Sequence, residues 1–290
     1  MGRMALWSCK SEKKFFLEAL ERKISPEKLF YRFGDDYFAY VDKNQANNGQ
    51  TIQSRNSLIG SFTEIWCKEL LKPISEKIGL FAINNVVCEE IGLTNQSDGD
   101  IALCLKEGKF QKPENIKIVF EVKMSIVSNY QYKHKHGELK YYGDYKSHKG
   151  NPSLLRSDSM LKAIGKAINI RVSGPSSTTI PIVIIGNTPI NKSYIKKVDH
   201  LKNSGIVQGF ISVYPKPSES NFIKETPEKG FQTVEDFDYL EKFITELAGG
   251  EVHYFSSMLS KKRIGQIIGI SNKEKCVEKK AETFLNLLRG

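Results

Sequence analysis

The sequence predicts an α/β protein in which a central mixed β-sheet is flanked by helices, with additional helices at both ends of the chain. Segments with helical and strand-like spacing of apolar residues alternate between Arg55 and Tyr214. The continuous apolar run at 180–185 is typical of a strand buried on both faces of a sheet. Three segments with helical spacing follow Pro215. We therefore divide the chain into N-terminal helices with a loop (1–54), a core (55–214) and a helical C-terminal section packed on the core (215–290).

The N-terminal section is expected to contain two helices and an exposed loop. Residues 11–22 have helical spacing, and Ser25-Pro26-Glu27 is typical of the start of a second helix. The stretch 34–55 is polar and rich in turn-forming residues, which predicts a surface loop. The core then begins with a strong helical pattern at 55–79, which Pro73 is expected to end or interrupt.

Three strands are predicted to follow this helix. They are 81–93, the apolar run 101–105, and a second apolar run that begins at Ile116 and ends with Glu121-Val122-Lys123. Because side chains alternate along a strand, Glu121 and Lys123 point to one face and Val122 points to the other. If the second and third strands form a hairpin, Asp100 lies beside the end of the third. Two carboxylates and one ammonium group then meet at one place.

The chemistry of this meeting point suits a divalent cation. Neighbouring carboxylates repel unless their charge is compensated, and hard oxygen ligands are those that Mg²⁺ prefers. Asp100 and Glu121 are the predicted metal ligands, and the main-chain carbonyl of Val122 can add a third. Lys123 can orient or deprotonate an attacking water, and its charge can stabilise a developing phosphorane. The alternative is a solvated hairpin end with an ordinary salt bridge between Glu121 and Lys123.

Asp100 followed by Glu121-Val122-Lys123 resembles the metal-binding motif of the PD-(D/E)XK nuclease superfamily, and within it the type II restriction endonucleases. The residue before Asp100 is Gly99 where the motif has proline, which leaves Asp98 as a rival metal ligand. Asp100 is preferred because it directly abuts the apolar run and so belongs to the strand. The order of predicted helices and strands from 55 to 214 is also similar to the common core of the superfamily.

The resemblance implies a restriction-endonuclease-like core and a Mg²⁺-dependent enzyme that hydrolyses phosphodiester bonds in double-stranded DNA at a specific short sequence. It also implies a 5′-phosphate product, and a homodimer is the default because palindromic sites match two-fold protein symmetry. In the superfamily a glutamate on the helix before the sheet can join the metal site, so Glu64 is a further catalytic candidate; an ordinary exposed helix glutamate is the alternative. Two other functions stay open, namely a structure-selective repair or junction nuclease of the same superfamily and a DNA-binding protein without catalysis.

The chain is basic, with a formal net charge of +10 and an isoelectric point near 9.2. An excess of this kind favours polyanionic partners, of which nucleic acid is the commonest. The insertion at 125–156 interleaves tyrosines with basic residues, which can contact phosphates, while tyrosine and arginine can also reach base edges. The expected DNA-contacting residues are Tyr130, Tyr132, Lys133, Lys135, Lys140, Lys146, Lys149 and Arg156.

A helix, a strand, a helix and a strand are predicted to complete the core, at 157–171, 180–185, 191–203 and 206–214. In the first of these helices Lys162 and Lys166 are expected on the outside, opposite an apolar face formed by Met160, Leu161, Ile164, Ala167 and Ile168. In the C-terminal section, helices are expected at 234–247, 254–268 and 273–288.

Cysteine usage and hydropathy limit the location and the class of function. The five cysteines include no C-x-x-C pair, which favours free thiols in a reducing cytoplasm. The sequence has no run of about 18 apolar residues and no apolar segment typical of a signal peptide, so we expect a cytoplasmic protein without a membrane anchor. It also lacks the G-x-x-x-x-G-K-[ST] loop and a dinucleotide fingerprint, which argues against an α/β enzyme that acts on a small molecule.

Overall fold

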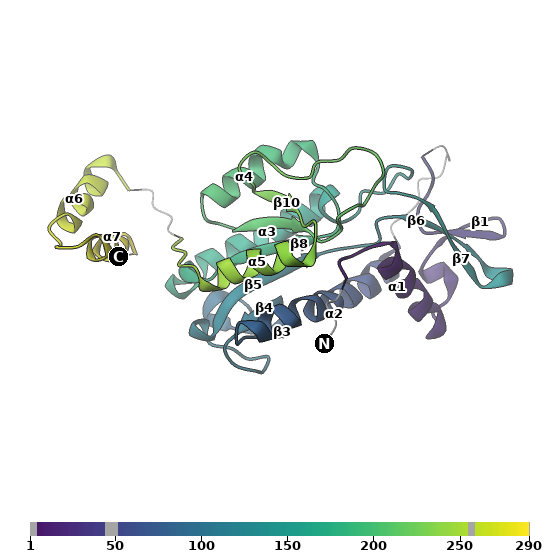
Figure 1. Ribbon diagram of the computed structural model, residues 1–290, viewed down its shortest axis with the longest axis horizontal. Coiled ribbons are helices and arrows are strands. Elements are labelled where there is room, and N and C mark those ends of the chain that lie inside the picture. The colour runs from purple at the N-terminus through teal and green to yellow at the C-terminus, as the bar shows by residue number, and fades with distance from the viewer. Residues whose placement is uncertain (1–4, 44–51, 255–258, 290) are drawn as a thin grey trace.

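The computed structural model describes residues 5–43, 52–254 and 259–289 (Figure 1). These residues form an α/β protein with seven α-helices, a mixed six-stranded β-sheet and an antiparallel four-stranded β-sheet. The predicted α/β class, with helices at both ends of the chain, is confirmed in this form. Residues 44–51 of the expected N-terminal loop lie outside the described residues. Among the described helices, none combines the length and the apolar character needed to span a bilayer.

Helices and strands alternate in the order that the sequence predicts for the core. The helices are α1 (Cys9–Glu21), α2 (Gln53–Lys77), α3 (Ser157–Val172), α4 (Ile195–Asn203), α5 (Phe237–Gly249), α6 (Lys261–Ser271) and α7 (Val277–Arg289). The strands of the large sheet are β3 (Phe81–Val86), β4 (Gly99–Cys104), β5 (Ile116–Lys123), β8 (Ile182–Gly186), β9 (Gly209–Ser212) and β10 (Phe231–Thr233). The predicted helices and strands between 55 and 214 correspond to α2, β3, β4, β5, α3, β8, α4 and β9.

Strand β5 is where the large sheet changes from antiparallel to parallel pairing. The strand order is β10-β9-β8-β5-β4-β3. Strands β3, β4 and β5 pair antiparallel, whereas β5, β8, β9 and β10 pair in parallel. Parallel neighbours need crossover connections, and α3 and α4 lie in the connections that lead to β8 and β9. The C-terminal end of β5 therefore lies in the middle of the sheet, beside the N-terminal end of β4.

Helices cover both faces of the large sheet (Figure 1). Helices α1, α2 and α5 cover one face, where Phe120 and Val122 of β5 are buried. Helices α3 and α4 cover the other face, where Val119 is buried. Since side chains alternate along a strand, Glu121 and Lys123 belong to the face that α3 covers. Because the side chains of β5 alternate between the two faces of the sheet, α3 is the helix that covers the candidate site.

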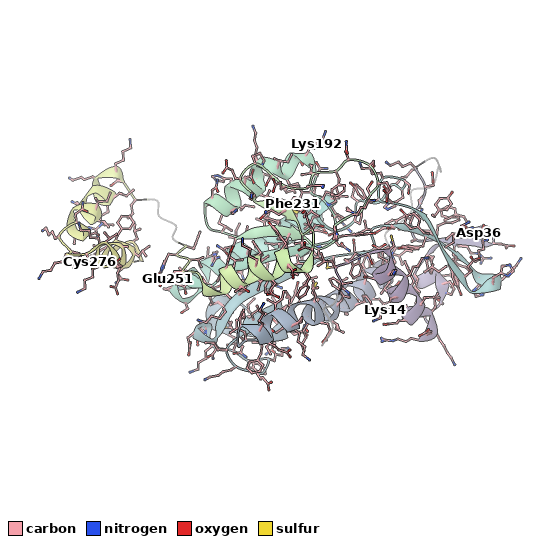
Figure 2. The ribbon with its side chains drawn as sticks, viewed as in Figure 1. Lys14, Asp36, Lys192, Phe231, Glu251 and Cys276 are labelled. Carbon is pink, nitrogen blue, oxygen red and sulfur yellow. The ribbon has the colours of Figure 1, made fainter. Side chains whose placement is uncertain are left out.

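The four-stranded sheet joins the N-terminal section to the insertion at 125–156. Its strand order is β1-β2-β6-β7, formed by β1 (Tyr31–Phe33), β2 (Asp36–Phe38), β6 (Asn129–Lys133) and β7 (Glu138–Gly143). Asp36 marks the outer end of this sheet in Figure 2. None of these strands is predicted from the sequence, because they are short and carry many polar residues. The insertion is therefore part of a sheet rather than an independent loop.

A buried carboxylate anchors α1 to the segment that leads into β6. Glu12 is fully buried and accepts hydrogen bonds from the N–H groups of Val127 (2.7 Å) and Ser128 (3.1 Å) and from the hydroxyl of Tyr130 (3.0 Å). Burial raises the pKa of Glu12 to about 7, although these donors favour the ionised form. Helix α1 thereby fixes the path of the chain after the end of β5.

Two local expectations differ from the structure. Helix α2 continues through Pro73, because the burial of Leu71 and Ile74 beside it offsets one missing hydrogen bond. The helix expected from Ser25 is a single 3-10 turn at Pro26–Lys28, after which the chain enters β1.

The C-terminal section divides into a helix on the core and a helical pair. Helix α5 buries Leu240 and Ile244 against the large sheet. Helices α6 and α7 pack against each other and lie apart from the sheet in Figure 1, and Cys276 between them is labelled in Figure 2.

Candidate active site

Asp100 and Glu121 face each other across the β4–β5 pair. Ile101 lies opposite Phe120, so the next positions along the ladder place Asp100 beside Glu121 on the face that α3 covers. Glu121 is 5 % exposed, and the side chain of Asp100 is 13 % exposed. Like charges directly opposite each other on neighbouring strands repel. The site therefore requires compensating cations.

Two lysines compensate these carboxylates. Lys123 forms a salt bridge with Oε1 of Glu121 and lies 3.9 Å from Oδ2 of Asp100. Lys166 of α3 places its ammonium 2.7 Å from Oε2 of Glu121 and 3.1 Å from Oδ1 of Asp100. The main-chain N–H of Val122 donates to Oδ2 of Asp100 at 2.7 Å. All four carboxylate oxygens thus have a positively charged or hydrogen-bonding neighbour.

Lys166 is the residue of this site that is not predicted from the sequence. The apolar spacing of α3 predicts it on the outside of the helix, whereas its side chain is only 17 % exposed. The buried apolar residues of α3 include Met160, Ala163, Ala167 and Ile170. Leu161 and Ile168, which were expected on the apolar face, are exposed. The sequence signal for Lys166 is its position between two small residues, Ala163 and Ala167, which are buried in α3. Small side chains at these positions let the helix approach the sheet and leave room for a long side chain.

The pKa values at the site follow from burial and from the facing charges. Burial, followed by the charge of Asp100, raises the pKa of Glu121, and the two lysines oppose this rise. Burial would lower the pKa of Lys166, but the charges of Glu121 and Asp100 outweigh burial and raise it. Lys166 is therefore held as a cation between the two carboxyl groups.

Glu64 is linked to the site through the backbone. Its main-chain carbonyl accepts a hydrogen bond from Nδ2 of Asn84 at 3.2 Å, and the same nitrogen lies 3.2 Å from the main-chain carbonyl of Asp100. Burial, followed by the charge of Asp100, raises the pKa of the Glu64 carboxyl to about 7. Within the described residues, no salt bridge joins Glu64 to Lys123 or Lys166. The structure thus brings Glu64 near the site without a direct contact to the two lysines.

Asp98, the rival of Asp100, has a different partner. Its carboxylate lies 3.6 Å from the ammonium of Lys109 and precedes the first residue of β4. Asp100 is the residue that lies opposite Glu121.

A basic cleft of about 770 Å³ opens beside Lys123. The end of β5 and the residues after it line the cleft, together with the N-terminal part of α2 and the segment 149–162. The charged side chains in its lining are five basic ones and one acidic one, namely Arg55, Lys123, Lys149, Arg156, Lys162 and Asp158. A concave surface with this excess of positive charge attracts phosphate groups.

Hydrogen bonds from two side chains to the main chain hold the segment at the end of β5. The hydroxyl of Ser153 donates to the main-chain carbonyl of Lys123 and accepts a hydrogen bond from the N–H of Asn187 at 3.1 Å. The side-chain amide of Asn187 donates to the main-chain carbonyl of Ser125 at 2.7 Å. These buried groups fix the backbone on both sides of Met124 and so orient Lys123 toward the cleft.

The predicted DNA-contacting residues do not share one surface. Lys149 and Arg156 line the cleft. Tyr130 and Tyr132 are buried, which contradicts the expectation that they contact DNA. The hydroxyl of Tyr130 donates to Glu12, so the ring packs in the core between α1 and the four-stranded sheet.

The four remaining predicted lysines lie outside the cleft lining. Lys133 and Lys140 belong to the four-stranded sheet, and Lys135 follows β6 and pairs with Asp35 at 3.1 Å. The ammonium of Lys146 donates to the main-chain carbonyl of Asn221. Their contact with DNA stays a prediction.

The donors of this site suit one Mg²⁺ ion with an incomplete protein shell. Oδ1 of Asp100 and Oε2 of Glu121 already share one cationic group, the Lys166 ammonium, so a single cation can contact both oxygens. The described residues contain no cluster of three or more His, Cys, Asp or Glu side chains placed to hold a metal. Besides these carboxylates and the predicted main-chain carbonyl of Val122, the other ligands would be water and phosphate oxygens, which is the shell that Mg²⁺ commonly keeps.

Comparison of the chain with protein-family models, with curated proteins and with solved structures finds no match.

We predict that Gly186→Ala disrupts the support of Lys123. Gly186 pairs with Lys123 in the β5–β8 ladder, and a Cβ at this position would lie 2.4 Å from Cγ of Leu154 and 2.9 Å from the hydroxyl oxygen of Ser153. Overpacking of this kind lowers the free energy of unfolding by about 1–3 kcal/mol, measurable by urea denaturation.

The matched control is Gly165→Ala on the exposed face of α3. A Cβ there meets no atom within 4 Å, so the substitution should raise the free energy of unfolding by about 0.5–1 kcal/mol. Equal stabilities of the two variants would contradict the role assigned to the turn at Ser153.

Proposed function

We propose that the protein is a Mg²⁺-dependent endodeoxyribonuclease that hydrolyses phosphodiester bonds in double-stranded DNA. The observation that carries the proposal is the meeting of Asp100, Glu121 and Lys123 at the end of β5, beside a basic cleft. The carboxylates suit a divalent cation, and the cleft suits the charge of a phosphate backbone. The resemblance of the motif and of the core element order to the PD-(D/E)XK superfamily favours the same function.

Each residue has a definable task in this proposal. Asp100, Glu121 and the carbonyl of Val122 would hold Mg²⁺, which when bound supplies positive charge to the scissile phosphate and acidifies its water. Lys123 contacts Glu121 and also lines the cleft, so its ammonium can donate to a phosphate oxygen or orient the attacking water. Lys149 can hold a neighbouring phosphate.

Glu64 is proposed as an assisting group rather than a ligand. Burial and the charge of Asp100 raise the pKa of its carboxyl. The ammonium groups of Lys123 and Lys166, however, contact the carboxylates of Asp100 and Glu121 rather than that of Glu64. A carboxyl in this position can accept a hydrogen bond from a water near the site.

Within this class we favour a type II restriction endonuclease that acts as a homodimer on a short specific sequence. The four-stranded sheet is a large addition to the core, and Tyr31 of β1 and the nearby Tyr40 line the cleft. Such an addition supplies surface for reading bases, whereas a structure-selective repair or junction nuclease needs little beyond the core. Two-fold symmetric DNA sites match a two-fold symmetric protein.

A DNA-binding protein without catalysis is the second candidate. The observation in its favour is that both carboxylates already have lysine partners, which is also what a structural ion-pair network provides. The basic cleft would serve either function.

We predict that Glu121→Gln abolishes Mg²⁺-dependent cleavage of plasmid DNA. Loss of one ligand charge should slow cleavage by about 10³-fold or more, because metal-ion stabilisation of the transition state contributes several kcal/mol. DNA binding in EDTA, measured by gel shift, should persist. Glu18→Gln, which removes a half-buried carboxylate of α1 away from the site, is the control and should cleave at the wild-type rate. Full activity of Glu121→Gln would exclude the proposed site.

We predict that Lys149→Ala and Arg156→Ala each weaken DNA binding for all sequences. Each substitution removes about one phosphate contact, so the slope of log K against log salt should become shallower by about 0.9. Lys14→Ala is the control, since Lys14 lies on α1 outside the cleft lining (Figure 2). Unchanged salt slopes, measured by fluorescence anisotropy in EDTA, would place the DNA on another surface.

A further inference from the structure

Lys166 lies where a cation shared by both carboxylates must lie. Its ammonium is 2.7 Å from Oε2 of Glu121 and 3.1 Å from Oδ1 of Asp100. We propose that Lys166 is a resident cation that balances the two carboxylates in the metal-free protein and is displaced when a divalent metal ion binds. The inference rests on the proposed function and adds a regulatory residue to the same site.

The two lysines of the site contact different oxygen atoms. Lys123 lies against Oε1 of Glu121 and near Oδ2 of Asp100, and Oδ2 also accepts the N–H of Val122. Within the described residues, Oδ1 and Oε2 are the oxygens that Lys166 contacts. A metal ion held by Asp100 and Glu121 would therefore compete with Lys166 for these oxygens, whereas Lys123 contacts the other oxygen of each carboxylate.

The metal-free site needs such a cation. Asp100 and Glu121 are neighbours on the sheet and largely withdrawn from water, so their mutual repulsion is poorly screened. Lys123 alone supplies one positive charge for two carboxylates. Lys166 supplies the second from a different element, α3, and so also ties this helix to the sheet.

Lysine is suited to a contact that must be reversible. Its ammonium is a compact charge on a flexible four-carbon chain, which can withdraw without movement of the helix. The side chain of Lys166 retains 17 % exposure, so solvent is already within reach of it. Two consequences follow: the metal-free protein is stable with its carboxylates paired, and metal affinity is lower than the two carboxylates alone would give.

The test compares Lys166→Met with wild type by thermal unfolding in EDTA and in a Ca²⁺ titration, without DNA. Removal of a buried ion-pair partner leaves an uncompensated carboxylate, so the melting temperature of Lys166→Met in EDTA should fall by about 5 °C. Because a ligand that binds the folded state stabilises it, Ca²⁺ should restore this loss. The dissociation constant for Ca²⁺ should be about tenfold lower in Lys166→Met than in wild type.

Lys162→Met is the matched control, one turn earlier on α3. The side chain of Lys162 is 70 % exposed and its ammonium lies 3.1 Å from Asp158, so the substitution removes the same charge without affecting Asp100 and Glu121. Its melting temperature in EDTA and its response to Ca²⁺ should equal those of wild type. The same response of Lys162→Met and Lys166→Met would overturn the inference, since a general charge effect would then suffice.

A second measurement uses the wild-type protein, so that it stays informative if Lys166→Met does not fold. Displacement of Lys166 into solvent should increase its modification by an amine-reactive ester severalfold in Ca²⁺, as measured by mass spectrometry, with Lys162 unchanged. Unchanged modification of Lys166, in Ca²⁺ that raises the melting temperature, would overturn the inference and leave the nuclease proposal intact. If neither Ca²⁺ nor Mg²⁺ stabilises either protein, the metal site fails, and with it both proposals.

Discussion

The charge balance between two strands is the constraint on which the rest of the site depends. Asp100 and Glu121 lie opposite each other on β4 and β5, where little water reaches them. Two carboxylates in this position are stable only with cations beside them. Lys123 comes from β5, the strand that carries Glu121, and Lys166 comes from α3. The position of α3 over the sheet is therefore coupled to the charge of the site.

The fold places the carboxylates of Asp100 and Glu121 beside the cleft. Strand β5 lies where antiparallel and parallel pairing meet, and its end is held by Ser153 and Asn187. The chain then runs past Glu12, whose buried carboxylate accepts hydrogen bonds from two main-chain N–H groups before β6 begins. Strand β5, the cleft and the four-stranded sheet therefore share one continuous stretch of backbone, and a change in its path would move all three.

Local periodicity predicted the part of the site that lies on the two neighbouring strands β4 and β5. Alternation along β5 and the apolar run of β4 suffice to place Asp100, Glu121 and Lys123 together, and the order of the core elements follows from the same patterns. Lys166 could not be placed in this way, because apolar residues occur around most of α3 and its spacing allows more than one rotation. The contact with the carboxylates belongs to the observed rotation, in which Leu161 and Ile168 are exposed. Tyr130 and Tyr132 were misassigned because a tyrosine beside lysines fits a DNA surface and a sheet core equally well.

The most direct test of the central claim is digestion of linear phage DNA of known sequence by the purified wild-type protein, in Mg²⁺ and in EDTA. We expect discrete fragments with 5′-phosphate ends in Mg²⁺ and intact DNA in EDTA, and the fragment ends would define the recognised sequence. Intact DNA in both conditions, or cleavage that persists in EDTA, would contradict the claim that Asp100, Glu121 and Lys123 form the centre of a metal-dependent nuclease.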